Sequence, residues 1–408
     1  MSTESRVNVY GSALGKVLTT ARGAVLTDQE GRAHVDLFSS AGVANFGHNH
    51  PVLKRQLMAY LEADGLVHGL DYHTESKQRF IERMEQRLLP DAVRGRYRYY
   101  FSPPAGTLAM EAAIKYARRA TGRRELAAFT NAFHGLTQNA LSITGNLAKR
   151  RSAYADLPNV TRLFYDGYLG ADFDYLTLYR KQFEDASGGA ALPAALVFET
   201  IQAEGGCHHC TPAWYEGVLA LCHEFGIVSI VDEIQAGVGR TGEYFSFPAL
   251  GHSWPDIICL SKSLSGMGLP LSLVMVRKEL DVLDPGENSG TFRGNCLGVA
   301  SAANAIDLFC DAEFQRRIAE NRAELDSFCL QLQEDLGLQV RGRGLLRGMV
   351  MKSRDAACAV LDRCRERGIL IEACGGDART LKLMPPLPIE TELLSQSLRT
   401  VRDVIRAG

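Results

Sequence analysis

The chain of 408 residues lacks a long apolar run, a strong net charge and an apolar leader. No apolar run approaches the length needed to cross a bilayer, so we expect no membrane-spanning segment. A formal net charge of -2, with no block of like charges, provides no basic field for nucleic acid. Residues 1–6 lack an apolar signal core, which favours a cytoplasmic location. Together, these absences favour small-molecule chemistry.

The ten cysteines show no regular spacing, which favours reduced thiols over a disulfide framework. Cys207, His208, His209 and Cys210 are four potential zinc ligands. Adjacent residues cannot all converge on one tetrahedral ion without a tight loop, and no second ligand pair lies nearby. We therefore expect no metal site here, but a polar loop that leads into a helix at 212–225.

Hydrophobic residues make up 46% of the chain and charged residues 23%, which is typical of a globular protein with a large core. The length allows two or three domains, and no repeat or low-complexity stretch interrupts it. The first fifty residues suggest short strands and turns, including a hairpin at 24–32. Apolar residues at helical spacing then predict two amphipathic helices between residues 51 and 89.

Strands and helices alternate along the middle of the chain, which predicts a largely parallel sheet covered by helices. The last seventy residues show an α+β pattern, and a long, once-broken helix connects the two regions. The expected strands are 125–129, 194–199, 227–231, 257–260, 271–276, 345–351 and 380–384; the expected helices are 107–120, one after Gly135, 213–225, 297–309, 317–336, 356–367 and 393–406.

Two polar residues stand at the ends of apolar runs. Asp232 ends the run 227–231, and Lys262 follows the run 257–260. In α/β proteins the carboxyl ends of strands are where ligands bind. A lysine that holds a cofactor aldehyde as a Schiff base, with a carboxylate that keeps a pyridine nitrogen protonated, is the chemistry of pyridoxal phosphate. Either residue alone is as easily an ordinary strand-end Asp or a surface Lys.

Other residues fit the same cofactor. Gly106 and Thr107 precede a helix and would provide backbone donors and a hydroxyl for a phosphate, although Thr is also an ordinary N-cap. Phe133, beside His134, would stack on the pyridine ring, although a core Phe is the commoner explanation. Gln235 would hydrogen-bond the phenolic oxygen, or is simply a solvated loop amide.

These residues lie in segments that resemble those of class III, ω-amino-acid type aminotransferases of fold type I. Within that family, the chain is most similar to the diaminobutyrate aminotransferases of the ectoine pathway. The matching segments run nearly end to end and comprise residues 41–51, 64–71, 133–135, 199–206, 232–242, 260–270 and 290–295.

The resemblance implies a pyridoxal 5'-phosphate enzyme with a large α/β domain, its mostly parallel sheet of the seven-stranded type, and a smaller α+β domain from both chain ends. We expect the small domain to comprise residues 1–50 and 306–408, and the large domain residues 51–305. Lys262 would link the cofactor and shuttle a proton, Asp232 would pair with its ring nitrogen, and Gln235, Gly106 and Thr107 would hold its oxygens.

The resemblance also implies a homodimer in which Thr291 reaches the phosphate of the neighbouring subunit; pairing of dimers into a tetramer stays open. Glu204 corresponds to an acidic residue that tunes acceptance of two substrates. Lys382 stands where many relatives have an arginine, and a lysine cannot give the bidentate grip of arginine on a carboxylate. The diaminobutyrate branch tends to share this lysine. Ala105 replaces a residue that is usually polar.

The predicted reaction transfers an amino group from glutamate to the aldehyde of aspartate β-semialdehyde, giving 2,4-diaminobutyrate and 2-oxoglutarate. Another ω-aminotransferase reaction of a specialised pathway is the first alternative. A racemase or mutase would use the same lysine and cofactor but would not release 2-oxoglutarate. A cofactor-binding module without turnover is the remaining alternative.

Overall fold

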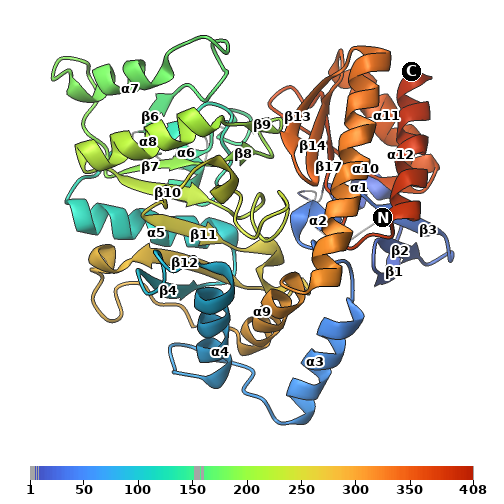
Figure 1. The fold of residues 1–408 in the computed structure, drawn as a ribbon, viewed down its shortest axis with the longest axis horizontal. Coiled ribbons are helices and arrows are strands. Elements are labelled where there is room, and N and C mark those ends of the chain that lie inside the picture. Colours follow the sequence, from blue (N-terminus) through green and yellow to red (C-terminus); the bar gives the residue numbers. More distant parts are fainter. Residues whose placement is uncertain (1–4, 6, 8, 151–156, 158–159, 408) are drawn as a thin grey trace.

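The protein is described by a computed structural model that covers residues 5, 7, 9–150, 157 and 160–407, without the side chains of residues 12 and 13. A seven-stranded sheet, covered by helices, forms the centre of the larger part of the molecule (Figure 1). In spatial order its strands are β4 (Tyr97–Ser102), β12 (Ser272–Arg277), β11 (Ile257–Leu260), β10 (Val228–Asp232), β7 (Ala195–Phe198), β5 (Leu126–Phe129) and β6 (Val160–Leu163).

Only β12 among these strands runs against its neighbours β4 and β11; the other adjacent pairs are parallel. This mostly parallel sheet confirms the predicted fold class. The sequence patterns did not predict β4 or β6, so the expected strand set was incomplete. The other expected strands of this sheet are present within a few residues of their predicted bounds.

The sheet strands carry alternating side chains into two apolar layers, as buried strands covered on both faces require. Ile230 belongs to the layer under α5 (Gly106–Thr121), whereas Val231 belongs to the layer under α8 (Pro212–Phe225). α8 begins where the Thr211 side chain accepts a hydrogen bond from the Trp214 N–H, with Pro at the first helical position. α5 ends at Gly122, whose φ of 68° is left-handed.

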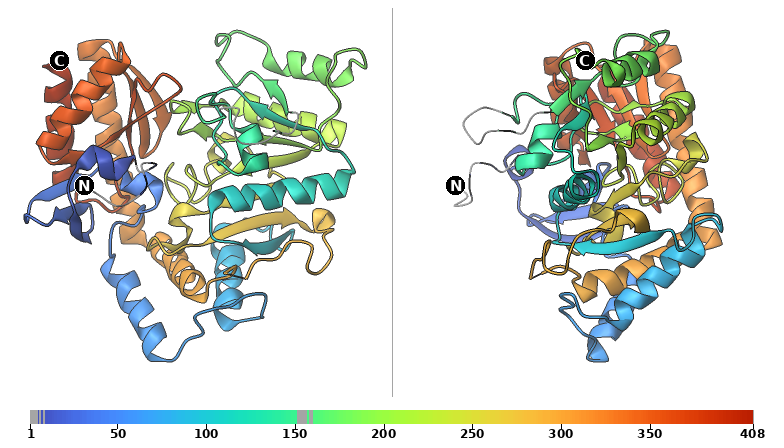
Figure 2. Two further views of the ribbon diagram at one scale, coloured as in Figure 1. Left: turned by 180° about the vertical axis from the view of Figure 1, so that it is seen from behind. Right: turned by 90° about the vertical axis from the view of Figure 1, so that its left-hand side faces the viewer.

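The smaller part of the molecule combines both chain ends (Figures 1 and 2). β15 pairs in parallel with β3 and so joins the carboxyl-terminal region to the amino-terminal strands. One sheet has the order β1 (Leu18–Arg22), β2 (Val25–Asp28), β3 (Ala33–Asp36), β15 (Ile369–Leu370), and another has the order β13 (Gln339–Arg343), β14 (Leu346–Val350), β17 (Thr380–Leu383), β16 (Glu372–Cys374). We propose that the two domains divide near residues 50 and 305.

Two helices connect these parts, α9 (Cys296–Phe309) and α10 (Ala312–Leu336), as the broken helical pattern predicts. The break is set by Asp311, whose side chain accepts hydrogen bonds from the N–H groups of Glu313 and Phe314. The other described helices are α1 (Tyr10–Leu14), α2 (Ser39–Gly42), α3 (Pro51–Glu62), α4 (Glu75–Arg83), α6 (Gln138–Ile143), α7 (Tyr175–Glu184), α11 (Arg354–Glu366) and α12 (Thr391–Arg406).

The segment 207–210 differs from the polar loop that the sequence suggests. His208 and His209 form the short strand β9, which pairs with β8 (Ile201–Gln202). Cys207 and Cys210 are buried, and each belongs to an apolar cluster of the core. Within the described ranges, no helix is both long and apolar enough to span a membrane.

Candidate functional site

A cavity of about 300 Å³ lies where β7, β10 and β11 end. It gathers eight of the residues that the sequence singles out, although they come from five separate segments: Gly106, Thr107, Phe133, His134, Glu204, Asp232, Gln235 and Lys262. Strand ends of a parallel sheet meet at one edge, which explains why distant segments converge here. Lys382 contacts this set without lining the cavity, and Thr291 does neither.

Asp232 is buried and fixed by two contacts. Its Oδ2 lies 2.8 Å from Nδ1 of His134, and its Oδ1 accepts a hydrogen bond from the Ile234 N–H at 3.0 Å. A carboxylate acceptor at that distance favours the His134 tautomer that is protonated at Nδ1. His134 Nε2 is buried and has no hydrogen-bond partner among the described residues. His134 therefore positions the carboxylate of Asp232.

Lys262 is the first residue of a short 3₁₀ turn after β11, Lys262–Ser265. Its φ of 45° is unusual for a residue with a side chain and marks local strain of the kind found at functional sites. The turn is anchored by Ser263, whose Oγ donates to the Gly42 carbonyl at 2.7 Å and accepts from the Asn45 N–H at 3.0 Å.

Burial lowers the pKa of the Lys262 amine, although the carboxylate of Glu204 opposes this shift. The ammonium of Lys382 lowers the pKa further. A lowered pKa increases the fraction of neutral amine, which is the form that can attack an aldehyde or accept a proton.

The start of α5 offers a binding site for an anion. No side chain caps its first turn, so backbone N–H groups of that turn stay available. Gly135 adjoins this turn, because a Cβ there would stand 2.3 Å from Thr107 Oγ1. The Thr107 and Thr137 hydroxyl oxygens are 2.7 Å apart. Thr137 Oγ1 donates its hydrogen to Glu111 at 2.6 Å, so the Thr107 hydroxyl must be the donor between the two threonines. That hydroxyl can turn toward an anion instead.

Glu199 directly follows β7, and Asp232 is the last residue of the neighbouring β10; both side chains line the cavity. Burial, and then the charge of Asp232, raise the pKa of Glu199 well above its usual range. Two carboxylates in one apolar site disfavour double ionisation, so we expect Glu199 to carry a proton. Its Oε2 accepts from the Phe133 N–H at 3.1 Å, which places Phe133 at the cavity wall.

The Gln235 side chain already makes more hydrogen bonds than its predicted role suggests. Its Nε2 donates to the Ala41 carbonyl and to Glu204 Oε1, both at 3.0 Å. Its Oε1 lies 3.3 Å from Lys382 Nζ. To donate to a cofactor oxygen, the amide would therefore have to exchange one of these bonds.

The residues of the cavity fit pyridoxal phosphate. Asp232 offers a buried carboxylate for a protonated ring nitrogen, and Lys262 offers an amine of lowered pKa for the aldehyde. The start of α5 offers backbone donors for the phosphate, and Gly135 leaves the Thr107 hydroxyl room that any larger residue would fill.

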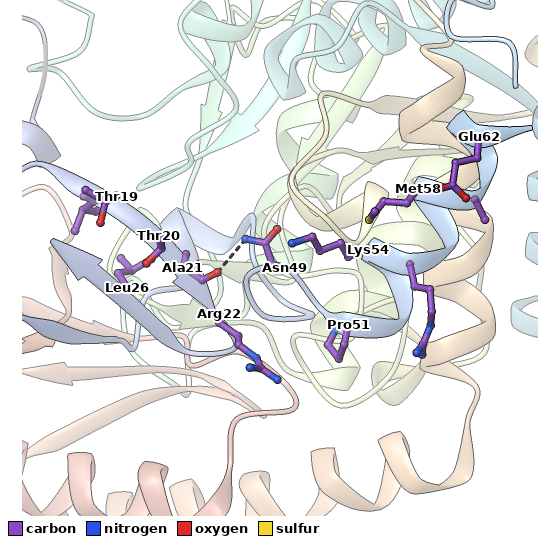
Figure 3. A pocket seen from close by; sticks show the side chains of 13 residues that line it. Thr19, Thr20, Ala21, Arg22, Leu26, Asn49, Pro51, Lys54, Met58 and Glu62 are labelled. Atoms are coloured by element: carbon purple, nitrogen blue, oxygen red, sulfur yellow. Dashed lines mark hydrogen bonds between the residues drawn. The ribbon is translucent and has the colours of Figure 1, made fainter. Parts of the chain in front are cut away.

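A larger cavity, of about 910 Å³, lies elsewhere between β1 and α3 (Figure 3). Its wall is bridged by Asn49, whose Nδ2 donates to the Ala21 carbonyl at 2.9 Å. None of the predicted site residues lines it. Size alone therefore does not identify the functional site of this chain.

Sequence reasoning overlooked Glu199 and Glu372. Glu199 carries the same signal as Asp232, a carboxylate at the end of an apolar strand, and could have been found by it. Glu372 has no such signal, because it belongs to the short strand β16 of the smaller part of the molecule and contacts the site through Lys382.

Comparisons with known proteins agree with this geometry. A family model described as aminotransferase class-III matches residues 8–405. The diaminobutyrate–2-oxoglutarate transaminase of Wolinella succinogenes is 41% identical over 98% of this chain and 94% of its own. The protein of that name from Bordetella parapertussis is 43% identical over 99% and 93%. The ornithine aminotransferase of Toxoplasma gondii, solved with partial occupancy of PLP at its active site, superposes with a TM-score of 0.82 at 26% identity, covering 96% and 90% of the two chains.

Proposed function

Since this chain belongs to the class-III aminotransferase family and is a pyridoxal phosphate-dependent transaminase, we propose that it transfers the amino group of glutamate to aspartate β-semialdehyde. The products would be 2,4-diaminobutyrate and 2-oxoglutarate. The observation that carries the proposal is the cavity that unites Lys262 with the Asp232–His134 pair. The names of relatives at 41% and 43% identity support the choice of substrate.

We propose the following roles for the residues of the cavity. When bound, pyridoxal phosphate supplies a ring that accepts electron density from the substrate carbon. Lys262 moves a proton at its Nζ to and from the substrate, which its lowered pKa favours. Asp232, held by His134, keeps a negative charge at the ring nitrogen. Gly106 and Thr107 hold the phosphate, and Phe133 flanks the ring.

The neighbouring subunit completes the site in this proposal. Thr291 is exposed and does not line the cavity of its own chain. An exposed hydroxyl on the loop before α9 is consistent with a contact to the phosphate bound by a second copy. We therefore propose a homodimer with two composite sites. Glu204 would contact the end of the substrate that is remote from the transferred amine, and Lys382 would act there through Glu204.

A panel assay tests the proposed reaction. The purified protein, loaded with pyridoxal phosphate, is incubated with glutamate and several ω-aldehydes, and 2-oxoglutarate and the aminated products are measured by mass spectrometry. Aspartate β-semialdehyde giving 2,4-diaminobutyrate as the dominant product is the expected result. 2-Oxoglutarate with a different preferred aldehyde would indicate another ω-aminotransferase. No 2-oxoglutarate with any acceptor would overturn the proposed donor.

A further inference from the structure

Lys382 lies between two carboxylates at the inner end of the site. Its side chain is 0% exposed, and its Nζ is 2.7 Å from Glu204 Oε1 and 2.9 Å from Glu372 Oε1. Burial alone would lower the pKa of Lys382, but these two carboxylates raise it well above its usual value. The two anionic neighbours therefore favour the charged form of Lys382.

The cluster carries more negative than positive charge. Burial would raise the pKa of Glu204, but Lys382 and Lys262 outweigh it and lower this pKa to about 2. Glu372 Oε2 accepts a hydrogen bond from the Tyr10 hydroxyl at 3.0 Å, and its Oε1 faces Lys382. When the Lys262 amine is neutral, two carboxylates with the ammonium of Lys382 leave one negative charge without a partner.

The two carboxylates differ in their access to the cavity. Glu204 lines it, and its side chain is 30% exposed. Glu372 does not line it and is 10% exposed. Glu204 Oε1 receives hydrogen bonds from both Lys382 and Gln235, whereas its Oε2 receives none from the residues that the structure describes. The cluster thus keeps one carboxylate oxygen without a partner among the described residues, on a side chain that lines the cavity.

We propose that Glu372 neutralises Lys382 and thereby leaves Glu204 with an uncompensated charge, so that Glu204 binds a second ammonium group of the substrate. This inference rests on the proposed function and specifies the class of the substrate that exchanges its ω-amino group with the enzyme: amines with an additional amino group at the remote end. A substrate that keeps the carboxylate but lacks this amino group gains nothing from Glu204. 2,4-Diaminobutyrate and 4-aminobutyrate are such a pair, because they differ only in the α-amino group.

The Glu372→Gln variant tests this inference. Glutamine keeps the size of the side chain and an oxygen for the Tyr10 hydroxyl but removes the charge, so Lys382 then cancels the charge of Glu204. We expect the ratio of kcat/KM for 2,4-diaminobutyrate to kcat/KM for 4-aminobutyrate, with 2-oxoglutarate as acceptor, to fall roughly tenfold, or about 1.4 kcal/mol. The loss should appear in KM rather than kcat, because it concerns binding remote from the reacting atoms.

A double variant separates charge from structure. In Glu372→Met with Lys382→Met, a mutually neutral pair is removed. Because the loss of Lys382 also raises the pKa of Glu204, the substrate ratio is measured over a range of pH, and it should return to the wild-type value at the upper end, where Glu204 is ionised. The surface variant Glu30→Gln, which breaks an exposed pair with Lys16, should leave the ratio unchanged and serves as the matched control. The Tyr10→Phe variant keeps every charge of the cluster and should also keep the ratio.

A measurement without turnover complements the kinetics. Enzyme loaded with pyridoxamine phosphate has no aldehyde for a donor amine, so calorimetry reports non-covalent binding of the two amines. The Glu372→Gln variant should lose its preference for 2,4-diaminobutyrate there too. The inference would be overturned if Glu372→Gln transferred amino groups with an unchanged substrate ratio. It would also be overturned if the substrate ratio of the double variant stayed as low as that of Glu372→Gln at every pH. No transfer from any amine to 2-oxoglutarate, even in the wild type, would instead overturn the proposed function.

Discussion

Glu233 follows Asp232 in the chain, and it is 0% exposed. Its Oε2 accepts from the Ser246 N–H at 2.7 Å, and its Oε1 accepts from the Ser246 hydroxyl. Burial raises the pKa of Glu233 from 4.5 to about 7, although the Ser246 hydrogen bonds oppose this shift. The charge of Asp232 adds to the increase. Replacement by glutamine keeps the shape and removes the titration.

The raised pKa makes the folded protein bind this proton more tightly than the unfolded chain does. The stability contributed by Glu233 is fully present below pH 4.5 and is lost as the pH rises through 7. Between pH 5.5 and 8.5 the loss amounts to about 1.5 pKa units, or about 2 kcal/mol at 1.36 kcal/mol per unit. The Glu233→Gln variant does not lose it, so its stability relative to wild type should increase by that amount over this range.

Thermal unfolding of both proteins at several pH values, in the same cofactor state, measures this difference. An unfolding entropy of about 2.1 cal/mol/K per residue gives roughly 0.9 kcal/mol per kelvin for 408 residues. The Tm of Glu233→Gln minus that of wild type should therefore rise by roughly 2 °C from pH 5.5 to 8.5. A difference that is independent of pH, or that falls as the pH rises, would refute the argument. Because Glu233 does not line the cavity, the variant should still transfer amino groups.

Three further substitutions address the cavity itself. Lys262→Ala should abolish transfer and remove the visible absorbance of the covalently held cofactor while circular dichroism stays native; retained transfer would contradict the assignment. Gly135→Ala should lower cofactor affinity at least tenfold in a titration, because its Cβ would meet Thr107 Oγ1 at 2.3 Å, whereas Gly376→Ala meets no atom within 4 Å and should bind normally. Glu199→Gln should retain kcat within severalfold at pH 7.5, because burial keeps the pKa of Glu199 high and the native side chain neutral; a loss as large as that of Lys262→Ala would show that its charge is needed.

Periodicity predicted most of the sheet because its central strands are short apolar runs between turns. Every residue of β10 and β11 is buried, and all of them except Ser229 and Asp232 are apolar. β4 was missed although its tyrosines favour strands, because Arg98 and partly exposed Tyr99 and Tyr100 break the apolar run. β6 was missed because Thr161 and Arg162 interrupt its apolar pattern, and three of its four residues are only half-buried.

The site was predictable where single residues carry the signal and unpredictable where pairs do. Asp232 and Lys262 stand out at strand ends without any knowledge of their neighbours. The contact of His134 with Asp232 joins residues 98 positions apart, and that of Lys382 with Glu204 joins residues 178 positions apart. Such pairings follow from strand order and loop path, which one sequence does not state. The surroundings of Lys382 therefore emerged only from the structure.

The charges around Lys262 explain why the proton balance of this site depends on burial. Glu204, Glu372 and Asp232 each raise the pKa of this amine, which must lose a proton to react. Only burial and the nearby ammonium of Lys382 oppose them, and burial has the larger effect. If Glu199 were ionised as well, one more carboxylate would favour the charged amine. A protonated Glu199 thus adds no further charge that would raise the pKa of Lys262.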